Sequence, residues 1–141
     1  MTTCSDVMTR NPACAHPEDT VANVARLMKE KDIGPVPIVQ DKLSKKLLGI
    51  VTDRDLALKV VAAGRDPNTT TVRDVMTTDV VTCREDDDIE QALEAMSRHQ
   101  LRRVLVVDAD NMLVGIIAQA DVATRMDEPE KTGEVVKEIS E

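Results

Sequence analysis

The hydrophobic positions of the chain follow two periods, and each period predicts one kind of element. Apolar residues at helical spacing occur in two segments, first at Val21, Val24, Ala25, Leu27 and Met28 and again at Ile89, Ala92, Leu93 and Met96. Short apolar runs predict strands at residues 36–39, 47–51, 104–107 and 113–117, and shorter extended pieces are expected at 13–16 and 80–83. A second helix is expected from Thr52 to Gly64 and its counterpart from near Ala118. Each half of the chain therefore has the predicted order strand, helix, strand, strand, helix.

Sequence motifs recur in the same order in both halves. Asp-Val-Met-Thr occurs at residues 6–9 and at 74–77, and Gly-Ile-Val-Thr-Asp-Arg-Asp at 49–55 aligns with Gly-Ile-Ile-Ala-Gln-Ala-Asp at 115–121. This duplication predicts a first repeat at 1–64, a linker at 65–71, a second repeat at 72–126 and an acidic tail at 127–141. The weak helical pattern of the tail fits either a partner-facing helix or a frayed end, and a frayed end is favoured. Neither copy can bury its strands and helices alone. We therefore predict an α+β fold in which two β-α-β-β-α repeats pack sheet to sheet with pseudo-twofold symmetry.

Composition and charge narrow the class of ligand. The chain has no Phe, Tyr or Trp, so its core is aliphatic and no aromatic side chain is available to stack on a base. Its formal net charge of −8 argues against DNA or RNA as a partner, whereas a small phosphorylated ligand needs only a few local arginines. No apolar run approaches the roughly 20 residues of a membrane span, and the N-terminus lacks the apolar stretch of a signal peptide. A cytoplasmic protein without a membrane partner is therefore expected.

The reactive side chains form no recognisable catalytic or metal-binding constellation. Cys4, Cys14 and Cys83 are odd in number and have no CxxC spacing, and we interpret them as reduced thiols. The alternative is a Cys14–His16 pair, whose side chains would share one face of a strand, but no third group orients them. His16 and His99 lack the spacing of metal ligands and are interpreted as surface residues. We predict no catalytic residue, no metal site and no required cofactor.

The duplicated motifs resemble the CBS domain, a unit of roughly 60 residues that is named for cystathionine β-synthase and is nearly always found in pairs. The resemblance rests on the two Asp-Val-Met-Thr segments, on Ile-Gly-Pro-Val-Pro-Ile-Val at 33–39 and on the motif at 49–55, and it covers residues 7–125. It implies a stand-alone bacterial pair with no enzyme or transporter domain attached. Many members bind AMP, ADP, ATP or S-adenosylmethionine in two pseudo-symmetric clefts and form homodimers, so the resemblance implies a regulatory module with an adenosine-type ligand.

The resemblance also assigns residues to both clefts, each of which is composite. Cleft A would use Ile50, Thr52, Arg54 and Asp55 together with Val80, Val81, Arg103 and Leu105. Cleft B would use Asp121 together with Pro12, Ala13, Val36 and Pro37. In the second copy Ala118 and Ala120 replace the hydroxyl residue and the arginine of the first, so cleft B is expected to be empty, weak, or specific for a less charged ligand.

Two interpretations of Thr52 and Asp55 stay open on local sequence. As ligand groups they would lie in the first turn of a helix, where free N–H groups and the helix dipole favour a phosphate and where a carboxylate can accept hydrogen bonds from a ribose. Arg54 and Arg103 would then neutralise the phosphate. As a capping box, Thr52 and Asp55 would instead satisfy each other's backbone donors.

Two functions are therefore compared. The first is an adenosine-nucleotide sensor that signals by changing its self-association or its binding to an unidentified protein partner. The second is a ligand-free dimerisation scaffold that uses the Ala- and Val-rich stretch at 58–63. An enzyme is a third class, for which the sequence offers no nucleophile, base or metal constellation.

Overall fold

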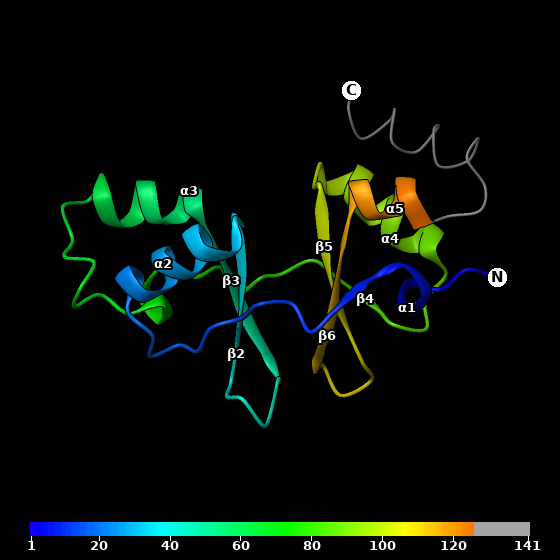
Figure 1. Cartoon of the computed structure of the whole chain (residues 1–141), viewed down its shortest axis with the longest axis horizontal. Coiled ribbons are helices and arrows are strands. Elements are labelled where there is room, and N and C mark those ends of the chain that lie inside the picture. Colours follow the sequence, from blue (N-terminus) through cyan, green and yellow to red (C-terminus); the bar gives the residue numbers. More distant parts are fainter. Residues whose placement is uncertain (126–141) are drawn as a thin grey trace. The chain divides into compact units, whose positions relative to one another are not determined.

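The chain forms two compact units (Figure 1) in a computed structural model that describes residues 1–125. One unit comprises Ala13–Val80, and the other comprises Met1–Pro12 with the chain from Val81 onward. Both contain helices and strands, which confirms the predicted α+β class. The sheet-to-sheet packing of the two repeats stays a prediction. The acidic tail predicted at 127–141, with its apolar positions Val135, Val136 and Ile139, lies outside the described residues.

The unit of residues 13–80 is built on an antiparallel hairpin of β2 (Pro35–Val39) and β3 (Leu47–Thr52). Helix α2 (Val21–Lys31) precedes the hairpin, and α3 (Asp53–Leu56) follows it directly and continues into a π-helical turn, η1 (Ala57–Val61). A 3-10 turn, η2 (Val72–Asp74), completes the unit. The helices lie on one side of the hairpin (Figure 1), and the core between them is aliphatic, with Val24, Ile38, Val51, Val60 and Val72 all at most 1% exposed.

The other unit contains a four-stranded sheet in the order β1-β6-β5-β4. Its strands are β1 (Thr9–Arg10), β4 (Thr82–Arg84), β5 (Arg103–Val107) and β6 (Leu113–Ala118). Strands β5 and β6 are antiparallel, whereas β4 runs parallel to β5. Its helices are α1 (Cys4–Val7), α4 (Ile89–His99) and α5 (Gln119–Arg125), and α4 and α5 cover one face of the sheet (Figure 1).

The two helices predicted from hydrophobic periodicity are both present. In α4, Ile89, Ala92, Leu93 and Met96 are all buried, as their spacing predicts. In α2, Val21, Val24 and Met28 are buried, but Ala25 is exposed because it lies at the edge of the apolar stripe. The third predicted helix begins after Thr52 and ends before Gly64, whose φ of +71° favours glycine.

The short extended pieces at the start of each repeat differ from expectation. The piece predicted at 80–83 is a strand at Thr82–Arg84 that pairs with β5. The piece predicted at 13–16 is not a strand: it makes a single bridge, in which the Ala15 N–H donates to the Pro37 carbonyl and the Val39 N–H donates to the Ala15 carbonyl. Because only Ala15 is paired in this way, the segment does not form a regular strand.

The predicted linker at 65–71 packs against the start of α2. The N–H groups of Val21 and Ala22, which have no acceptor inside the helix, donate to the carbonyls of Thr70 and Pro67. Thr70 is buried. The segment therefore belongs to the unit of residues 13–80 and supplies part of the N-terminal cap of its first helix.

The Asp-Val-Met-Thr segment of each copy packs in the unit formed by the rest of the other copy. Thr9 pairs with Ile116 of β6, and Thr77 exchanges two backbone hydrogen bonds with Ile50 of β3, at 2.9 and 2.8 Å. The aligned glycines allow this approach: a Cβ on Gly49 would lie 2.7 Å from the Thr77 carbonyl oxygen. The two packing units are residues 13–80 and residues 1–12 with the chain from residue 81. They therefore do not coincide with the sequence repeats at 1–64 and 72–126.

Candidate functional site

Thr52 and Asp55 lie where β3 passes into α3, and they form a complete capping box. The Thr52 N–H donates to Asp55 Oδ2 at 2.9 Å, and the Asp55 N–H donates to Thr52 Oγ1 at 3.2 Å. The Thr52 hydroxyl also donates to Asp55 Oδ2 at 3.2 Å. The capping interpretation of these residues is therefore confirmed, and any ligand role must be compatible with it. Both side chains are half-buried, so each is still partly accessible to solvent.

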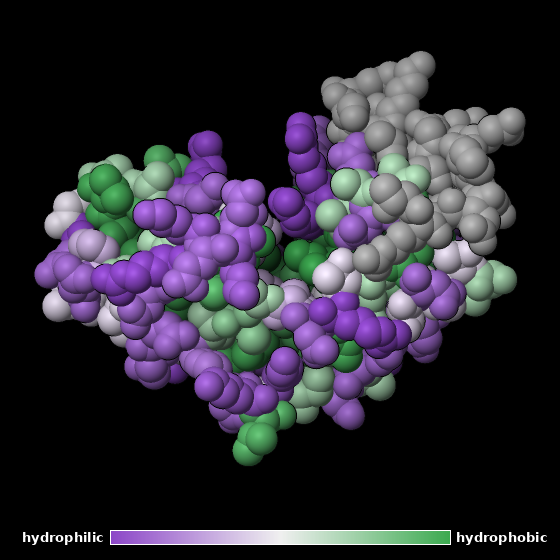
Figure 2. Space-filling view, in the orientation of Figure 1, coloured by the Kyte–Doolittle hydropathy of each residue, from purple (hydrophilic) through white to green (hydrophobic). Residues whose placement is uncertain are grey.

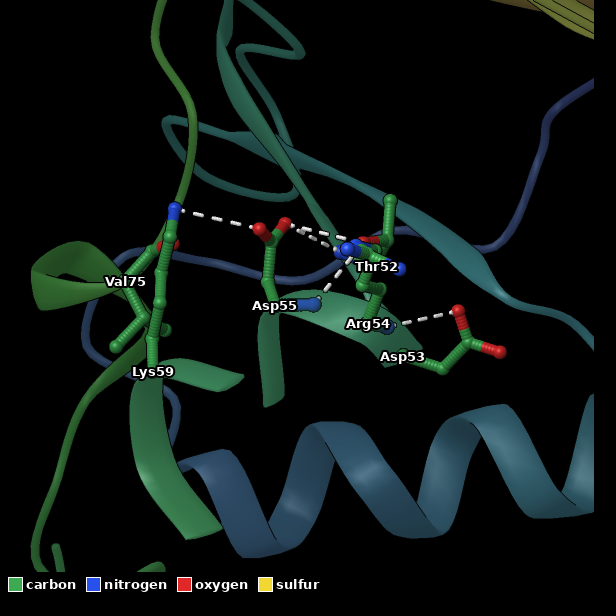
Figure 3. A network of polar contacts seen from close by, with 6 residues as sticks. All are labelled: Thr52, Asp53, Arg54, Asp55, Lys59 and Val75. Atoms are coloured by element: carbon green, nitrogen blue, oxygen red, sulfur yellow. Dashed lines mark hydrogen bonds and ion pairs between the residues drawn. The ribbon is translucent and has the colours of Figure 1, made fainter. Parts of the chain in front are cut away.

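The second carboxylate oxygen of Asp55 faces Lys59, as Figure 3 shows. Lys59 Nζ lies 3.2 Å from Asp55 Oδ1 and donates to the Val75 carbonyl at 3.1 Å. Sequence reasoning missed Lys59, although its spacing of four residues from Asp55 on a predicted helix is the usual spacing of an intrahelical ion pair. The contact with Val75 had no sequence signal, because it joins residues from different repeats.

Arg54 and Asp53 complete the first turn of α3. The Arg54 side chain is exposed, and its backbone N–H donates to Asp53 Oδ1 at 2.9 Å. The Asp53 N–H donates to the Gly34 carbonyl at 3.1 Å, which attaches the turn to the residue before β2. The junction thus presents two cationic side chains, Arg54 and Lys59, within one helical turn of the Asp55 carboxylate.

The structure brings together five of the eight residues predicted for cleft A in one unit. Ile50, Thr52, Arg54 and Asp55 lie at the β3–α3 junction, and Val80 ends the same unit. The Ile50–Thr77 bridge holds the start of the segment that leads to Val80 beside β3. Val81, Arg103 and Leu105 belong to the other unit, Arg103 and Leu105 on β5 and Val81 just before β4, so cleft A as a whole stays a prediction.

The residues predicted for cleft B are also divided between the units. Asp121 and Pro12 belong to one unit, and Ala13, Val36 and Pro37 to the other. Asp121 keeps half of the capping box, because its Oδ2 accepts from the Ala118 N–H at 3.1 Å, but Ala118 has no hydroxyl to return a bond. Val36 is fully buried in the core of its own unit. The second junction therefore has one side-chain donor fewer than the first, and cleft B as a whole stays a prediction.

The three cysteines are free, and two of them share a core. Cys4 in α1 and Cys83 in β4 are buried together, whereas Cys14 is half-buried in the other unit. The hydrogen bond with Cys83, followed by burial, raises the pKa of the Cys4 thiol far above its ordinary value. Cys4 is therefore a protonated core residue, in keeping with the reduced thiols expected from the sequence.

Residues 1–125 lack two features that would point to a metal ion or to a membrane. No three His, Cys, Asp or Glu side chains in this part of the chain are grouped so that they could hold a metal ion. No helix in the same part has both the length and the apolar character needed to cross a bilayer.

Comparison with known proteins decides the family. Residues 4–62 and 72–128 each match the model of the CBS domain. The chain belongs to the CBS domain family. It is 38% identical over 140 residues to the CBS domain-containing protein YhcV of Bacillus subtilis, which covers 99% of this chain and 96% of that protein. The resemblance drawn from the duplicated motifs is thereby confirmed.

Solved structures of similar sequence share the tandem CBS fold. The crystal structure of Hypoxic Response Protein I, which holds two coordinated zinc ions, has a TM-score of 0.79 and 37% identity and covers 89% of this chain and all (100%) of that one. CBSX2 in complex with AMP has a TM-score of 0.74 and 28% identity, with 88% of this chain and 95% of that chain covered. The CBS domain pair of protein MJ0100, in complex with 5′-methylthioadenosine and S-adenosyl-L-methionine, has a TM-score of 0.72 and 31% identity, with 88% and 94% covered.

Proposed function

We propose that this CBS protein is a regulatory module, not an enzyme, and that it binds an adenosine-containing ligand in cleft A. The observation that carries the proposal is the β3–α3 junction, where the Asp55 carboxylate lies beside the Thr52 hydroxyl, the Lys59 ammonium and the exposed Arg54. AMP in CBSX2, and 5′-methylthioadenosine and S-adenosylmethionine in the MJ0100 pair, support an adenosine compound as the class of ligand.

The junction can exchange its internal hydrogen bonds for bonds to a nucleoside. A carboxylate offers about four lone-pair sites, and Asp55 uses three of them for the Thr52 N–H, the Thr52 hydroxyl and Lys59. The Thr52 hydroxyl can rotate away without breaking the backbone cap, which frees a second site for a ribose diol. Its proton would then point to a phosphate, whose charge the exposed Arg54 offsets. The cap and the ligand role are therefore compatible.

The proposal predicts a measurable affinity that depends on Asp55. Isothermal titration calorimetry with AMP, ADP, ATP and S-adenosylmethionine should show binding of at least one, and Asp55→Asn should weaken it by about tenfold or more, since a charge-assisted hydrogen bond contributes about 1.5–3 kcal/mol. The control Asp110→Asn makes the same chemical change in an exposed turn of the other unit and should leave the affinity unchanged. No heat with any of the four compounds, or equal affinity in Asp55→Asn, would refute the proposal.

The same titration distinguishes the two clefts. Asp121→Asn changes the carboxylate that corresponds to Asp55 in the second copy. We expect it to leave the high-affinity site intact, because that junction lacks the hydroxyl and the arginine. A loss of affinity in Asp121→Asn but not in Asp55→Asn would move the site to cleft B.

One observation favours the second function, a ligand-free homodimerisation scaffold. Leu58 and Val61 are 53% and 75% exposed on η1, and Figure 2 shows hydrophobic residues gathered over this end of the α3–η1 helix. Under this alternative the protein would be a dimer of fixed mass whose melting temperature no adenosine compound changes. Analytical ultracentrifugation with and without AMP, on the native chain and on Leu58→Gln/Val61→Gln, tests it. A dimer that dissociates in the double variant without any nucleotide effect would favour the scaffold.

A further inference from the structure

Lys59 joins two parts of the chain that the sequence repeats keep apart. Its ammonium bridges Asp55 Oδ1, at 3.2 Å, and the Val75 carbonyl, at 3.1 Å (Figure 3). Asp55 belongs to the first repeat, and Val75 lies in the Asp-Val-Met-Thr segment that opens the second. Both lie in the unit of residues 13–80. The Lys59 side chain is 46% exposed, so it reaches both acceptors from the surface of the unit.

The bridge holds the Asp55 carboxylate from the side opposite to its cap. Oδ2 accepts from the Thr52 N–H and hydroxyl, while Oδ1 faces Lys59. Donors on both oxygens restrict rotation of the carboxylate, whose side chain is only 18% exposed. A ribose diol binds more tightly to a carboxylate of fixed orientation, because fewer groups are then ordered on binding.

The bridge also fixes the segment that leads toward Val80, another residue predicted for cleft A. Val75 is buried, and two residues later Thr77 exchanges two hydrogen bonds with Ile50. The segment is thus attached both before Thr52, through Ile50, and after Asp55, through Lys59. Val80, which is predicted to line cleft A, lies three residues beyond Thr77.

Lys59 lies in η1, the π-helical turn Ala57–Val61 that follows α3. Such turns are rare and occur frequently at functional sites. The second half of this helix thus departs from regular α geometry at the turn that carries the bridging lysine.

We propose that Lys59 is a positioning residue for cleft A, which orients the Asp55 carboxylate and couples it to the Val72–Asp74 turn and the residues after it. The inference rests on the proposed function. It predicts that Lys59→Met weakens AMP affinity about fivefold to tenfold, because one half-exposed charge-assisted contact is lost. Lys59→Arg should stay within about twofold of the native chain, since a guanidinium can donate to both acceptors.

The test is a double-mutant cycle on AMP affinity, measured by calorimetry on the full chain. The four proteins are the native chain, Lys59→Met, Asp55→Asn and the double variant. Asp55→Asn retains a carbonyl oxygen that can accept hydrogen bonds, so residual binding stays measurable. If Lys59 acts through Asp55, Lys59→Met should have little further effect in the Asp55→Asn background.

Arg65→Met is the matched control for the loss of a positive charge between the same two segments. Arg65 Nη2 pairs with Asp74 Oδ2 at 3.1 Å and so joins the chain just after η1 to the last residue of η2, next to Val75, but Arg65 is not paired with Asp55. The AMP affinity of the Arg65→Met variant should equal that of the native chain. Lys59→Gln provides a second variant should Lys59→Met fail to fold, which circular dichroism would report.

The outcomes separate this inference from the function on which it rests. Native affinity in both Lys59→Met and Lys59→Gln, or the same loss in Arg65→Met, would overturn the role of Lys59 and leave the nucleotide site intact. An equal further loss in the Asp55→Asn background would overturn positioning through Asp55. Absence of binding of AMP, ADP, ATP and S-adenosylmethionine by the native chain would overturn the proposed function and this inference together.

Discussion

Gly49 is the position at which the attachment of the second Asp-Val-Met-Thr segment can be tested most directly. A Cβ at this position would lie 2.7 Å from the Thr77 carbonyl oxygen and 3.1 Å from Met76 Sδ. The nearer atom is backbone, and it cannot turn aside as a side chain can. Gly49→Ala must therefore displace the segment from β3.

The cost of that displacement follows from what the segment contributes. The two Ile50–Thr77 hydrogen bonds contribute about 1 kcal/mol each, less a discount for the exposure of Thr77. Partial exposure of Val75, which is 1% exposed, adds up to about 2 kcal/mol. We expect a loss of about 2–4 kcal/mol in the free energy of unfolding, which corresponds to a fall in melting temperature of roughly 10 °C for a domain of this size.

Differential scanning calorimetry measures the effect, and Gly34→Ala is its control. The atoms nearest to a Cβ on Gly34 would belong to the carboxylate of Asp53, at 3.3 Å, and this exposed side chain can move. Its melting temperature should therefore change by a few degrees at most. If Gly49→Ala melts within about 2 °C of the Gly34→Ala protein, then Thr77 is not held against β3 and the reasoning fails.

Two further predictions concern the cysteines and Asp6. Titration with a thiol reagent should label Cys14 first, and Cys4 and Cys83 only on unfolding, because both are buried and the pKa of Cys4 is raised; rapid labelling of all three in the native state would contradict this. Hydrogen bonds from the backbone and hydroxyl of Thr3 lower the pKa of the Asp6 carboxyl. The ionised carboxylate therefore stabilises the fold fully above the ordinary aspartate pKa of about 3.9, and this contribution is lost as the pH falls through the lowered pKa. Asp6→Asn should flatten the decline in melting temperature below about pH 4, and an unchanged pH profile would show that the Thr3 contact contributes nothing.

Local sequence determined α2, α3, α4 and α5, most strands and the cap at the candidate site, but it did not indicate the short helix α1. Apolar spacing placed α2 and α4, and Thr52 with Asp55 predicted a capping box that the structure contains in full. These features depend on residues within four positions of one another, so the sequence carries their signal directly. The duplication was visible for a different reason: two segments of one sequence can be compared without knowing whether they are in contact.

Only the tertiary structure decided which segments pack together. Residues 1–12 join the unit of the second repeat and residues 72–80 that of the first, because the Thr9 and Thr77 segments pair with β6 and with Ile50 of β3. The Lys59–Val75 contact spans 16 residues and joins a side chain to a backbone carbonyl, which any residue at position 75 would offer. Sequence patterns report which face of an element is apolar. They do not report which backbone group lies opposite a given side chain, and at this site that contact defines the role proposed for Lys59.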